Sequence, residues 1–293
     1  MSIQLNKGID RKKRRNENIA FGLFRAMSFM VVGILFFILG FIVMKGFSVL
    51  SWDFITKMPT DGMTKGGIYP AIVGTFCLIG GSVLFSFPIG VMAGIYMNEY
   101  ATKGLFVKFI RMMTNNLAGI PSIVFGLFGI SLFVNTLQFG DSILAGSLTL
   151  ALLTLPVIIR TTEEALKAVD NSFRQGSYAL GATKLQTIRR VVLPIAYPNI
   201  ITGMILSIGR ISGETAPILF IVAYFTIKLP TSIYDQVMAL PYHLYVLATS
   251  GTDIEKSRPI AYGTALVLIL IVLIINLIAN GLRRYFSNKV KMN

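Results

Sequence analysis

The sequence predicts an all-α membrane protein, a polytopic bundle of six transmembrane helices. Hydrophobic residues make up 54% of the 293 residues and charged residues only 14%, and the mean hydropathy is +0.70, far above that of a soluble domain. The apolar runs lack the alternation of membrane strands, and each reaches the length of about 20 residues that a spanning helix needs. The six runs cover residues 25–50, 70–97, 110–137, 140–160, 195–226 and 259–282.

The distribution of basic residues sets the expected orientation. With six spans both termini lie on one side, and that side holds 20 of the 27 Lys and Arg residues, against six on the other side and Arg210 within a span. The positive-inside rule therefore predicts cytoplasmic termini, and the net charge of +14 needs no nucleic acid to explain it. We expect a basic cytoplasmic arm at residues 1–24, a transmembrane domain at 25–284 and a cytoplasmic tail at 285–293.

The first two runs are expected to play different roles. The first is uniformly apolar apart from its glycines, which is typical of a helix that faces lipid. The second contains six glycines and prolines between Gly74 and Gly94, and such a density of small residues favours close helix contacts in a membrane. It is therefore expected to be a packed interior helix, with the single cysteine, Cys77, in its core. One cysteine excludes a disulfide framework and a cysteine metal cluster.

Polar residues interrupt the third run. Asn115, Asn116 and Ser122 bring two amides and a hydroxyl to membrane depth, and Pro121 breaks the helix there. Irregular backbone inside a membrane is tolerated where it lines a water-filled route, so we interpret this run as a helix beside a transport pathway. A polar clasp between neighbouring helices is the alternative.

A charged segment follows the fourth run, which is expected to end at Pro156 and Arg160. Arg160 can simply snorkel to the inner membrane interface. We call residues 161–194 the knob and expect it to fold into three short cytoplasmic helices, the middle one, Phe173–Leu180, ending at Gly181. The three capping boxes that predict them are Thr161 with Glu164, Ser172 with Gln175, and Thr183 with Gln186.

The fifth run carries a cation and an anion near its middle. Arg210 and Glu214 are four residues apart and would share one face of a helix, where each neutralises the other. Arginine offers a planar fork of donors that matches carboxylate, sulfate or phosphate, and it stays charged at any working pH. The pair therefore indicates a route for an oxyanion. A structural ion pair that clamps two helices is the alternative.

The backbone around this pair is expected to be unusual. Gly209 and Gly213 form a GxxxG pair, which lets a second helix approach closely. Pro217 lacks an N–H and disturbs the carbonyl of Gly213, which frees a backbone acceptor near both charges.

The outer loop at residues 228–258 is long for a connection and mixes prolines with tyrosines, which favours a docking surface for another protein. The single histidine, His243, lies in this loop without ligand partners, and we expect it at a surface or interface. The sixth run is almost purely aliphatic and closes the bundle.

Motifs for catalysis and nucleotide binding are missing from the sequence. The nearest approach to a phosphate-binding loop, Gly176–Lys184, lacks the GK[ST] ending and lies within a helical pattern. One histidine, one cysteine and no cluster of carboxylates in the spans make an enzyme a weak hypothesis. We therefore expect a transport subunit without catalytic residues, a metal site or a cofactor of its own.

Residues 176–194, GSYALGATKLQTIRRVVLP, resemble the EAA loop of ABC importer permeases. Gly181 stands at the loop glycine, and after nine intervening residues Val191, Leu193 and Pro194 match its closing Ile-x-Leu-Pro, although Gln175–Ser177 replace Glu-Ala-Ala. The strings RISGETAPILF, LAGIPSIVFGLFG and IIRTTEEAL are more narrowly similar to the permease subunits of phosphate-specific ABC importers, and the resemblance covers residues 65–282.

The resemblance implies a type I ABC importer of a bacterial or archaeal cell membrane. Its expected partners are a second, homologous permease subunit, a separate ATPase dimer that binds ATP and Mg²⁺, and an extracytoplasmic phosphate-binding protein. It also implies that Arg160, Arg210 and Glu214 belong to the phosphate route. The residues themselves indicate only an oxyanion, so sulfate, molybdate or a secondary anion transporter stay open. The residues expected to contact the ATPase, at the tip of the knob, are Tyr178, Ala179, Leu180, Gly181 and Ala182.

Overall fold

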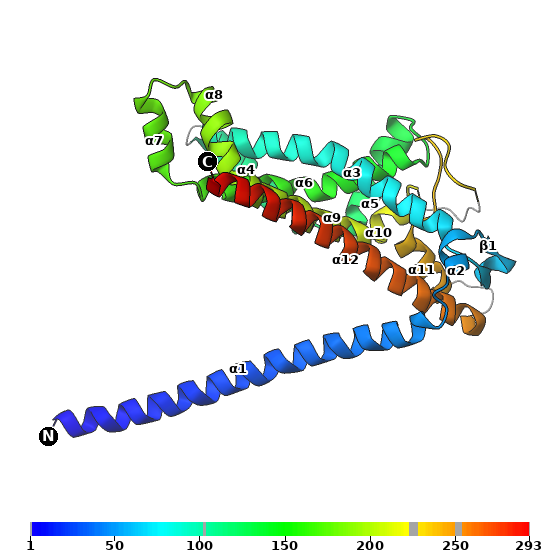
Figure 1. The fold of residues 1–293 in the computed structure, drawn as a ribbon, viewed down its shortest axis with the longest axis horizontal. Helices are drawn as coiled ribbons and strands as arrows, with labels where there is room; N and C mark the ends of the chain where they lie inside the picture. Colours follow the sequence, from blue (N-terminus) through cyan, green and yellow to red (C-terminus); the bar gives the residue numbers. More distant parts are fainter. Residues whose placement is uncertain (1, 102–103, 223–227, 250–253, 293) are drawn as a thin grey trace.

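The computed structural model describes residues 2–101, 104–222, 228–249 and 254–292, and it is an elongated helical bundle (Figure 1). Within this part of the chain, five helices are long and apolar enough to cross a membrane, and a bent pair makes a sixth span. The prediction of six transmembrane helices is therefore confirmed. The long helices are α1 (Ser2–Phe47), α3 (Tyr69–Ile95), α6 (Ile143–Lys167), α9 (Leu193–Gly213) and α12 (Ile254–Met292), and the bent pair is α4 (Leu105–Leu117) with α5 (Ser122–Gly129).

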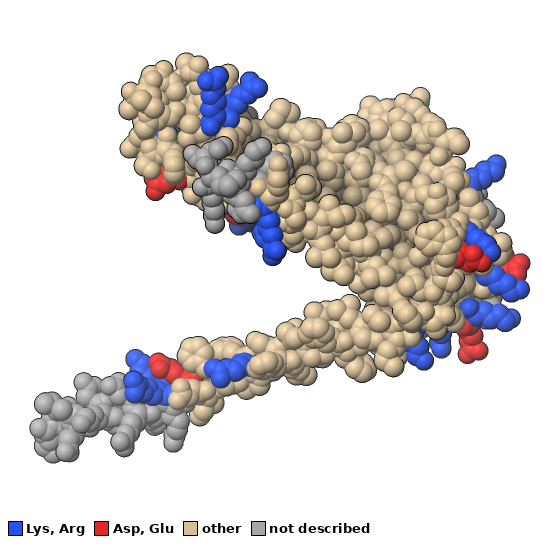
Figure 2. Space-filling view, viewed as in Figure 1, with Lys and Arg blue, Asp and Glu red and all other residues tan. Residues whose placement is uncertain are grey.

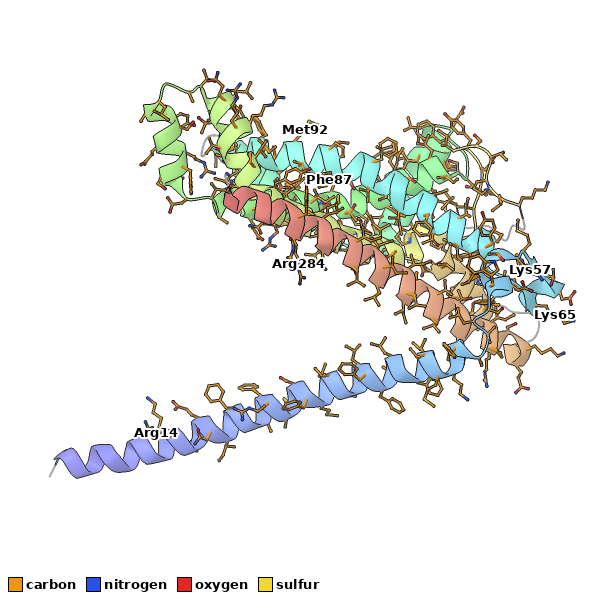
Figure 3. The ribbon with its side chains drawn as sticks, in the orientation of Figure 1. Arg14, Lys57, Lys65, Phe87, Met92 and Arg284 are labelled. Atoms are coloured by element: carbon orange, nitrogen blue, oxygen red, sulfur yellow. The ribbon has the colours of Figure 1, made fainter. Side chains whose placement is uncertain are left out.

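Charged residues gather at the two ends of the bundle. On the face shown in Figure 2, Lys, Arg, Asp and Glu lie toward the two ends, and the surface between them is almost free of charged residues. Arg14 and Arg284 lie toward the end that holds both termini, and Lys57 and Lys65 lie at the opposite end (Figure 3). This distribution is the one expected of a protein whose middle is embedded in lipid.

Helix α3 packs tightly against α6 because its glycines let the two backbones approach. A methyl group added at Gly90 would come within 2.6 Å of Ile158, and one at Gly94 within 2.7 Å of Thr162. The predicted close helix contacts are thus confirmed, but the interior position is not: only 33% of the most apolar window of α3 is buried, against 61% of that of α6. The sequence reasoning ended the fourth span at Pro156, but α6 continues through this proline to Lys167.

Helix α1 lies apart from the bundle along most of its length (Figure 1). It meets α12 only near its carboxyl end, where the rings of Phe41 and Tyr262 make an edge-to-face contact at 5.6 Å. None of the 18 residues of its most apolar window is buried, as expected of a lipid-facing helix. The helix runs without a break across the expected boundary between residues 24 and 25.

Short elements cover the end of the bundle that lies opposite the termini (Figure 1). These are α2 (Trp52–Thr56), the strands β1 (Pro59–Thr60) and β2 (Lys65–Gly66), and α11 (Leu240–Thr249). The strands pair antiparallel, with Pro59 opposite Gly66. Part of the expected outer docking loop, residues 250–253, lies outside the described residues.

The expectation that His243 lies at a surface is wrong, because α11 folds inward and only 1% of His243 is exposed. Its Nδ1 lies 3.2 Å from the Thr264 hydroxyl, which itself donates to the Ile260 carbonyl. Since that hydroxyl has one proton, Nδ1–H donates to Thr264. Burial lowers the pKa of His243 from 6.5 to about 4.

We expect the protein to lose stability as the pH falls from about 6.5 to about 4, because the unfolded chain gains a proton there while folded His243 stays neutral. A depression of this size corresponds to roughly 3 kcal/mol. Thermal unfolding of the purified protein in detergent, measured from pH 7.5 downward, tests this for wild type and His243→Gln. The variant should show a weaker pH dependence, and equal dependence would contradict the assignment.

The knob differs from the three predicted helices. Thr161 starts no helix: α6 already extends through it, so the Thr161 hydroxyl donates back to the Val157 carbonyl at 2.9 Å. The expected middle helix is α7 (Asn171–Ala179), whose cap is Asp170 rather than Ser172. The Asp170 carboxylate accepts from the Ser172 backbone N–H, which lowers its pKa.

The third helix of the knob begins where the sequence indicates, but it does not end with the knob at residue 194, because the helix continues through the π-helical turn Ile188–Val192 into α9. Helix α8 (Lys184–Thr187) begins with the predicted capping box between Thr183 and Gln186. Gly181 has a φ of +79°, a left-handed conformation that favours glycine, so α7 ends where the sequence indicates.

Candidate functional site

Helix α9 ends beside the predicted charge pair. Glu214 has extended backbone angles, φ −74° and ψ 126°, so the helix stops at Gly213 and the short helix α10 (Ala216–Leu219) follows. The expectation that Arg210 and Glu214 lie on one continuous helix is therefore wrong. The proline at the start of α10 and the extended Glu214 produce a full break, and the cation Arg210 occupies the last turn of α9, where the helix dipole stabilises it.

Arg210 and Glu214 nevertheless form an ion pair. The Arg210 Nε lies 3.4 Å from Glu214 Oε1, with 38% of the arginine side chain and 16% of the glutamate side chain exposed. The pair is thus loose and its arginine is accessible.

The face of α9 around Arg210 has no partner within the described chain. A methyl group added at Gly209 or Gly213 would meet nothing within 4 Å, and 60% of Leu206 is exposed. Among the described residues, no helix therefore packs on the GxxxG pair, although the sequence predicts that a second helix could approach there. The open face is available to a water-filled route or to a second subunit.

A second helix break lies next to the first. Helices α4 and α5 meet at 103° across the Pro121 region, so the predicted break is confirmed. Helix α5 then packs on α10, since a methyl group at Gly126 would lie 3.0 Å from Pro217 Cα. Ser122, at the start of α5, is half-buried, while Asn115 and Asn116 on α4 are exposed. Two irregular segments thus share one region of the bundle, which is the arrangement found beside transport sites.

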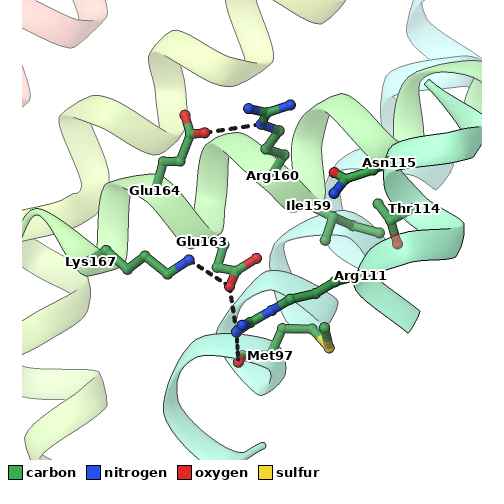
Figure 4. A pocket seen from close by; sticks show the side chains of 9 residues that line it. All are labelled: Met97, Arg111, Thr114, Asn115, Ile159, Arg160, Glu163, Glu164 and Lys167. Atoms are coloured by element: carbon green, nitrogen blue, oxygen red, sulfur yellow. Dashed lines mark hydrogen bonds and ion pairs between the residues drawn. The ribbon is translucent and has the colours of Figure 1, made fainter. Parts of the chain in front are cut away.

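Arg160 lies in a separate charged pocket of about 210 Å³ between α4 and α6 (Figure 4). Its Nε pairs with Glu164 Oε1 at 3.0 Å. Glu163 Oε1 pairs with Arg111 Nη2 at 2.6 Å and with Lys167 Nζ at 2.8 Å. The pocket thus joins three cations to two carboxylates, and Asn115 also lines it.

The structure brings Asn115 to Arg160 but keeps Arg160 apart from Arg210. Gly203 of α9 packs on Thr161 of α6, so Arg160 lies at the level of Gly203. Arg210 is seven residues further along α9, or about 10 Å at the rise of an α-helix. The two arginines therefore occupy different depths, each with a glutamate four residues later.

Sequence reasoning missed three members of the pocket. These are Arg111, Glu163 and Lys167, none of which the sequence assigns to the site. The signal that could have identified the latter two is their spacing of four residues, which continues the helix of Arg160.

The tip of the knob projects into solvent. Leu180 is 90% exposed and Tyr178 is 43% exposed, and α7 has no buried residue. Such exposed apolar side chains on a folded, capped segment indicate a surface for another protein. Within the described residues, no group of three His, Cys, Asp or Glu side chains could hold a metal ion.

The fold and the knob define a class of membrane transport protein. Residues 86–292 match the family described as the binding-protein-dependent transport system inner membrane component, and the chain belongs to this family. The fold is that of type I ABC importer permeases: a solved bacterial alginate ABC transporter, in complex with its alginate-bound periplasmic protein, superposes with a TM-score of 0.66 over 90% of this chain and 95% of that chain at 18% identity.

Curated relatives are more similar in sequence to this chain than the alginate transporter is. The chain is 39% identical to the phosphate transport system permease protein PstA of Mycobacterium leprae, over 92% of this chain and 90% of that protein. It is 33% identical to the probable ABC transporter permease protein YqgI of Bacillus subtilis, over 96% of this chain and 99% of that protein. It is also 35% identical to PstA of Haemophilus influenzae, over 89% of this chain and 90% of that protein.

Proposed function

We propose that this chain is the permease subunit of an ATP-driven importer that moves inorganic phosphate into the cytoplasm. The observation that carries the proposal is the accessible Arg210–Glu214 pair at a helix break, on a face that no helix of the described chain covers. The substrate is supported by relatives that are phosphate transport system permease proteins. An arginine at this depth binds an oxyanion through its planar fork of donors.

Arg210 and Glu214 act as a latch in this proposal. An unpaired arginine near the middle of a membrane costs at least about 2.5 kcal/mol, so Arg210 is always paired with something. Between turnovers the partner is Glu214. Phosphate brings one or two charges and more acceptor oxygens than a carboxylate, so it displaces Glu214 when delivered at high local concentration. The return of the carboxylate then releases the anion.

The pocket at Arg160 is a second station on the same route. Its three cations already share two carboxylates, so an arriving anion can again exchange with a carboxylate. Asn115 lines the pocket, and Asn116 and Ser122 supply further donors along the broken span. The distance between the two arginines fits a stepwise passage rather than one shared site.

The same proposal assigns the orientation of the chain and its contacts with the other subunits. The termini and the knob face the cytoplasm of a bacterial or archaeal cell, because most basic residues lie on that side. The knob contacts a separate ATPase dimer that supplies ATP and Mg²⁺, through Tyr178, Ala179, Leu180, Gly181 and Ala182. The open face of α9 meets a second, homologous permease subunit, and the outer loop receives an extracytoplasmic phosphate-binding protein.

Uptake by membrane vesicles that contain the whole complex tests this function. We expect ATP-dependent accumulation of labelled phosphate that requires this chain and that excess sulfate or molybdate does not suppress. Suppression by sulfate or molybdate would assign a different oxyanion. Uptake driven by an ion gradient without ATP would instead indicate a secondary transporter and overturn the proposal.

A further inference from the structure

A buried ion pair joins the knob to a distant membrane helix. The Arg174 Nη2 of α7 lies 2.7 Å from Oε1 of Glu99, in the π-helical turn η2 (Tyr96–Tyr100) that ends α3. Only 14% of the arginine side chain and 6% of the glutamate side chain are exposed. Every other salt bridge found among the described residues has at least one partner that is more exposed than either of these.

Arg174 also holds the end of α6. Its Nη1 donates to the Val169 carbonyl and its Nη2 to the Leu166 carbonyl, both at 2.8 Å. The last carbonyls of a helix have no partner within the helix, so Arg174 caps α6. One guanidinium therefore connects three segments: α7, the carboxyl end of α6 and the carboxyl end of α3.

The knob contacts η2 at a second point. The Lys184 ammonium at the start of α8 lies over the Tyr100 ring, 4.9 Å from its centre, and Asn98 supports Glu99 with a hydrogen bond of 2.8 Å. By contrast, α7 has no buried residue. The polar contacts of Arg174, rather than an apolar core, thus fix α7 to the membrane helices. A π-helical turn is often found where a helix serves a function.

We propose that Arg174 and Glu99 form a strut that transmits movement of α7 to α3 and α6. Because α3 packs along α6, and α6 carries Arg160, a displacement of α7 reaches the charged pocket through rigid elements. Arg174 is thus a positioning residue for energy coupling. The inference rests on the proposed function, in which α7 contacts the ATPase.

The test compares transport with ATP hydrolysis in the same vesicles, which contain the whole complex. Glu99→Gln keeps the size of the side chain but removes the charge that holds Arg174. We expect the phosphate moved per ATP hydrolysed to fall by about tenfold or more, with the complex still assembled. Arg174→Lys keeps the charge but cannot reach the Leu166 and Val169 carbonyls and Glu99 at once, so the phosphate moved per ATP should lie between those of wild type and Glu99→Gln.

Lys65→Gln is the matched control, because it breaks the exposed Lys65–Asp61 pair at the opposite end of the molecule. It should leave the ratio unchanged. An unchanged ratio in Glu99→Gln would overturn the strut while leaving the phosphate importer intact. Loss of assembly in both Glu99→Gln and Arg174→Lys would also overturn it, since the pair would then support the fold alone. Failure of the proposed function is distinguishable, because the wild-type vesicles would not take up phosphate.

Discussion

Arg210→Gln should abolish phosphate uptake and leave the subunit in the membrane. The variant removes the charged fork that exchanges Glu214 for phosphate, and truncating one member of such a pair costs several kcal/mol, so uptake should fall by about 100-fold or more. The fold should persist, because the side chain is 38% exposed and its one ion pair among the described residues is the loose one to Glu214. Phosphate uptake at matched membrane abundance measures the effect.

Two further substitutions complete this test: one separates charge from geometry at Arg210, and the other is a control at a distant arginine. Arg210→Lys keeps the charge but loses the planar fork, so uptake should be impaired without being abolished. Arg284→Gln is the matched control, since this arginine is exposed near the carboxyl end of α12, away from the helix breaks. Wild-type uptake in Arg210→Gln would contradict the role of Arg210 in carrying phosphate.

Gly181→Asp should uncouple the complex or prevent its assembly. Gly181 has a φ of +79°, a conformation that costs a residue with a side chain roughly 1–2 kcal/mol. The added carboxylate would also stand beside Leu180 and Tyr178, the exposed residues that we assign to the ATPase contact. Co-purification of the ATPase and phosphate uptake are the two measurements.

A control variant separates the effect of backbone strain at Gly181 from the effect of its position in the knob. Gly140 has a similar φ of +67° and, like Gly181, has nothing within 4 Å of an added methyl group, but it lies in the loop before α6, outside the knob. Gly140→Asp should therefore retain the ATPase. Normal association and uptake in Gly181→Asp would show that the tip of the knob is not the coupling surface.

The span pattern was predictable because membrane length and hydropathy leave few alternatives. The end of α7 at Gly181 and the start of α8 at the Thr183 capping box were equally predictable, since both depend on a few neighbouring residues. The false capping box at Thr161 shows the limit of local patterns: the same four residues cap a helix only if the preceding turn is not already helical, and α6 had not ended.

Features that depend on tertiary packing could not be predicted from the sequence. His243 looked like a loop residue because nothing in its neighbourhood reveals that α11 folds inward against α12. Arg111 and Glu163 are 52 residues apart, and Arg174 and Glu99 are 75 residues apart. Such pairs form only after the helices have packed, whereas Arg210 and Glu214 were found because they are close in sequence.

The double variant Arg210→Gln with Glu214→Gln tests the latch most directly. A structural clamp predicts recovery, because removing both charges leaves no unpaired ion, whereas each single variant strands one. The latch predicts no recovery, because the guanidinium that binds phosphate is absent. Phosphate uptake at matched abundance should therefore be as low in the double variant as in Arg210→Gln alone. Uptake restored to the wild-type rate would contradict the role of Arg210 in carrying phosphate.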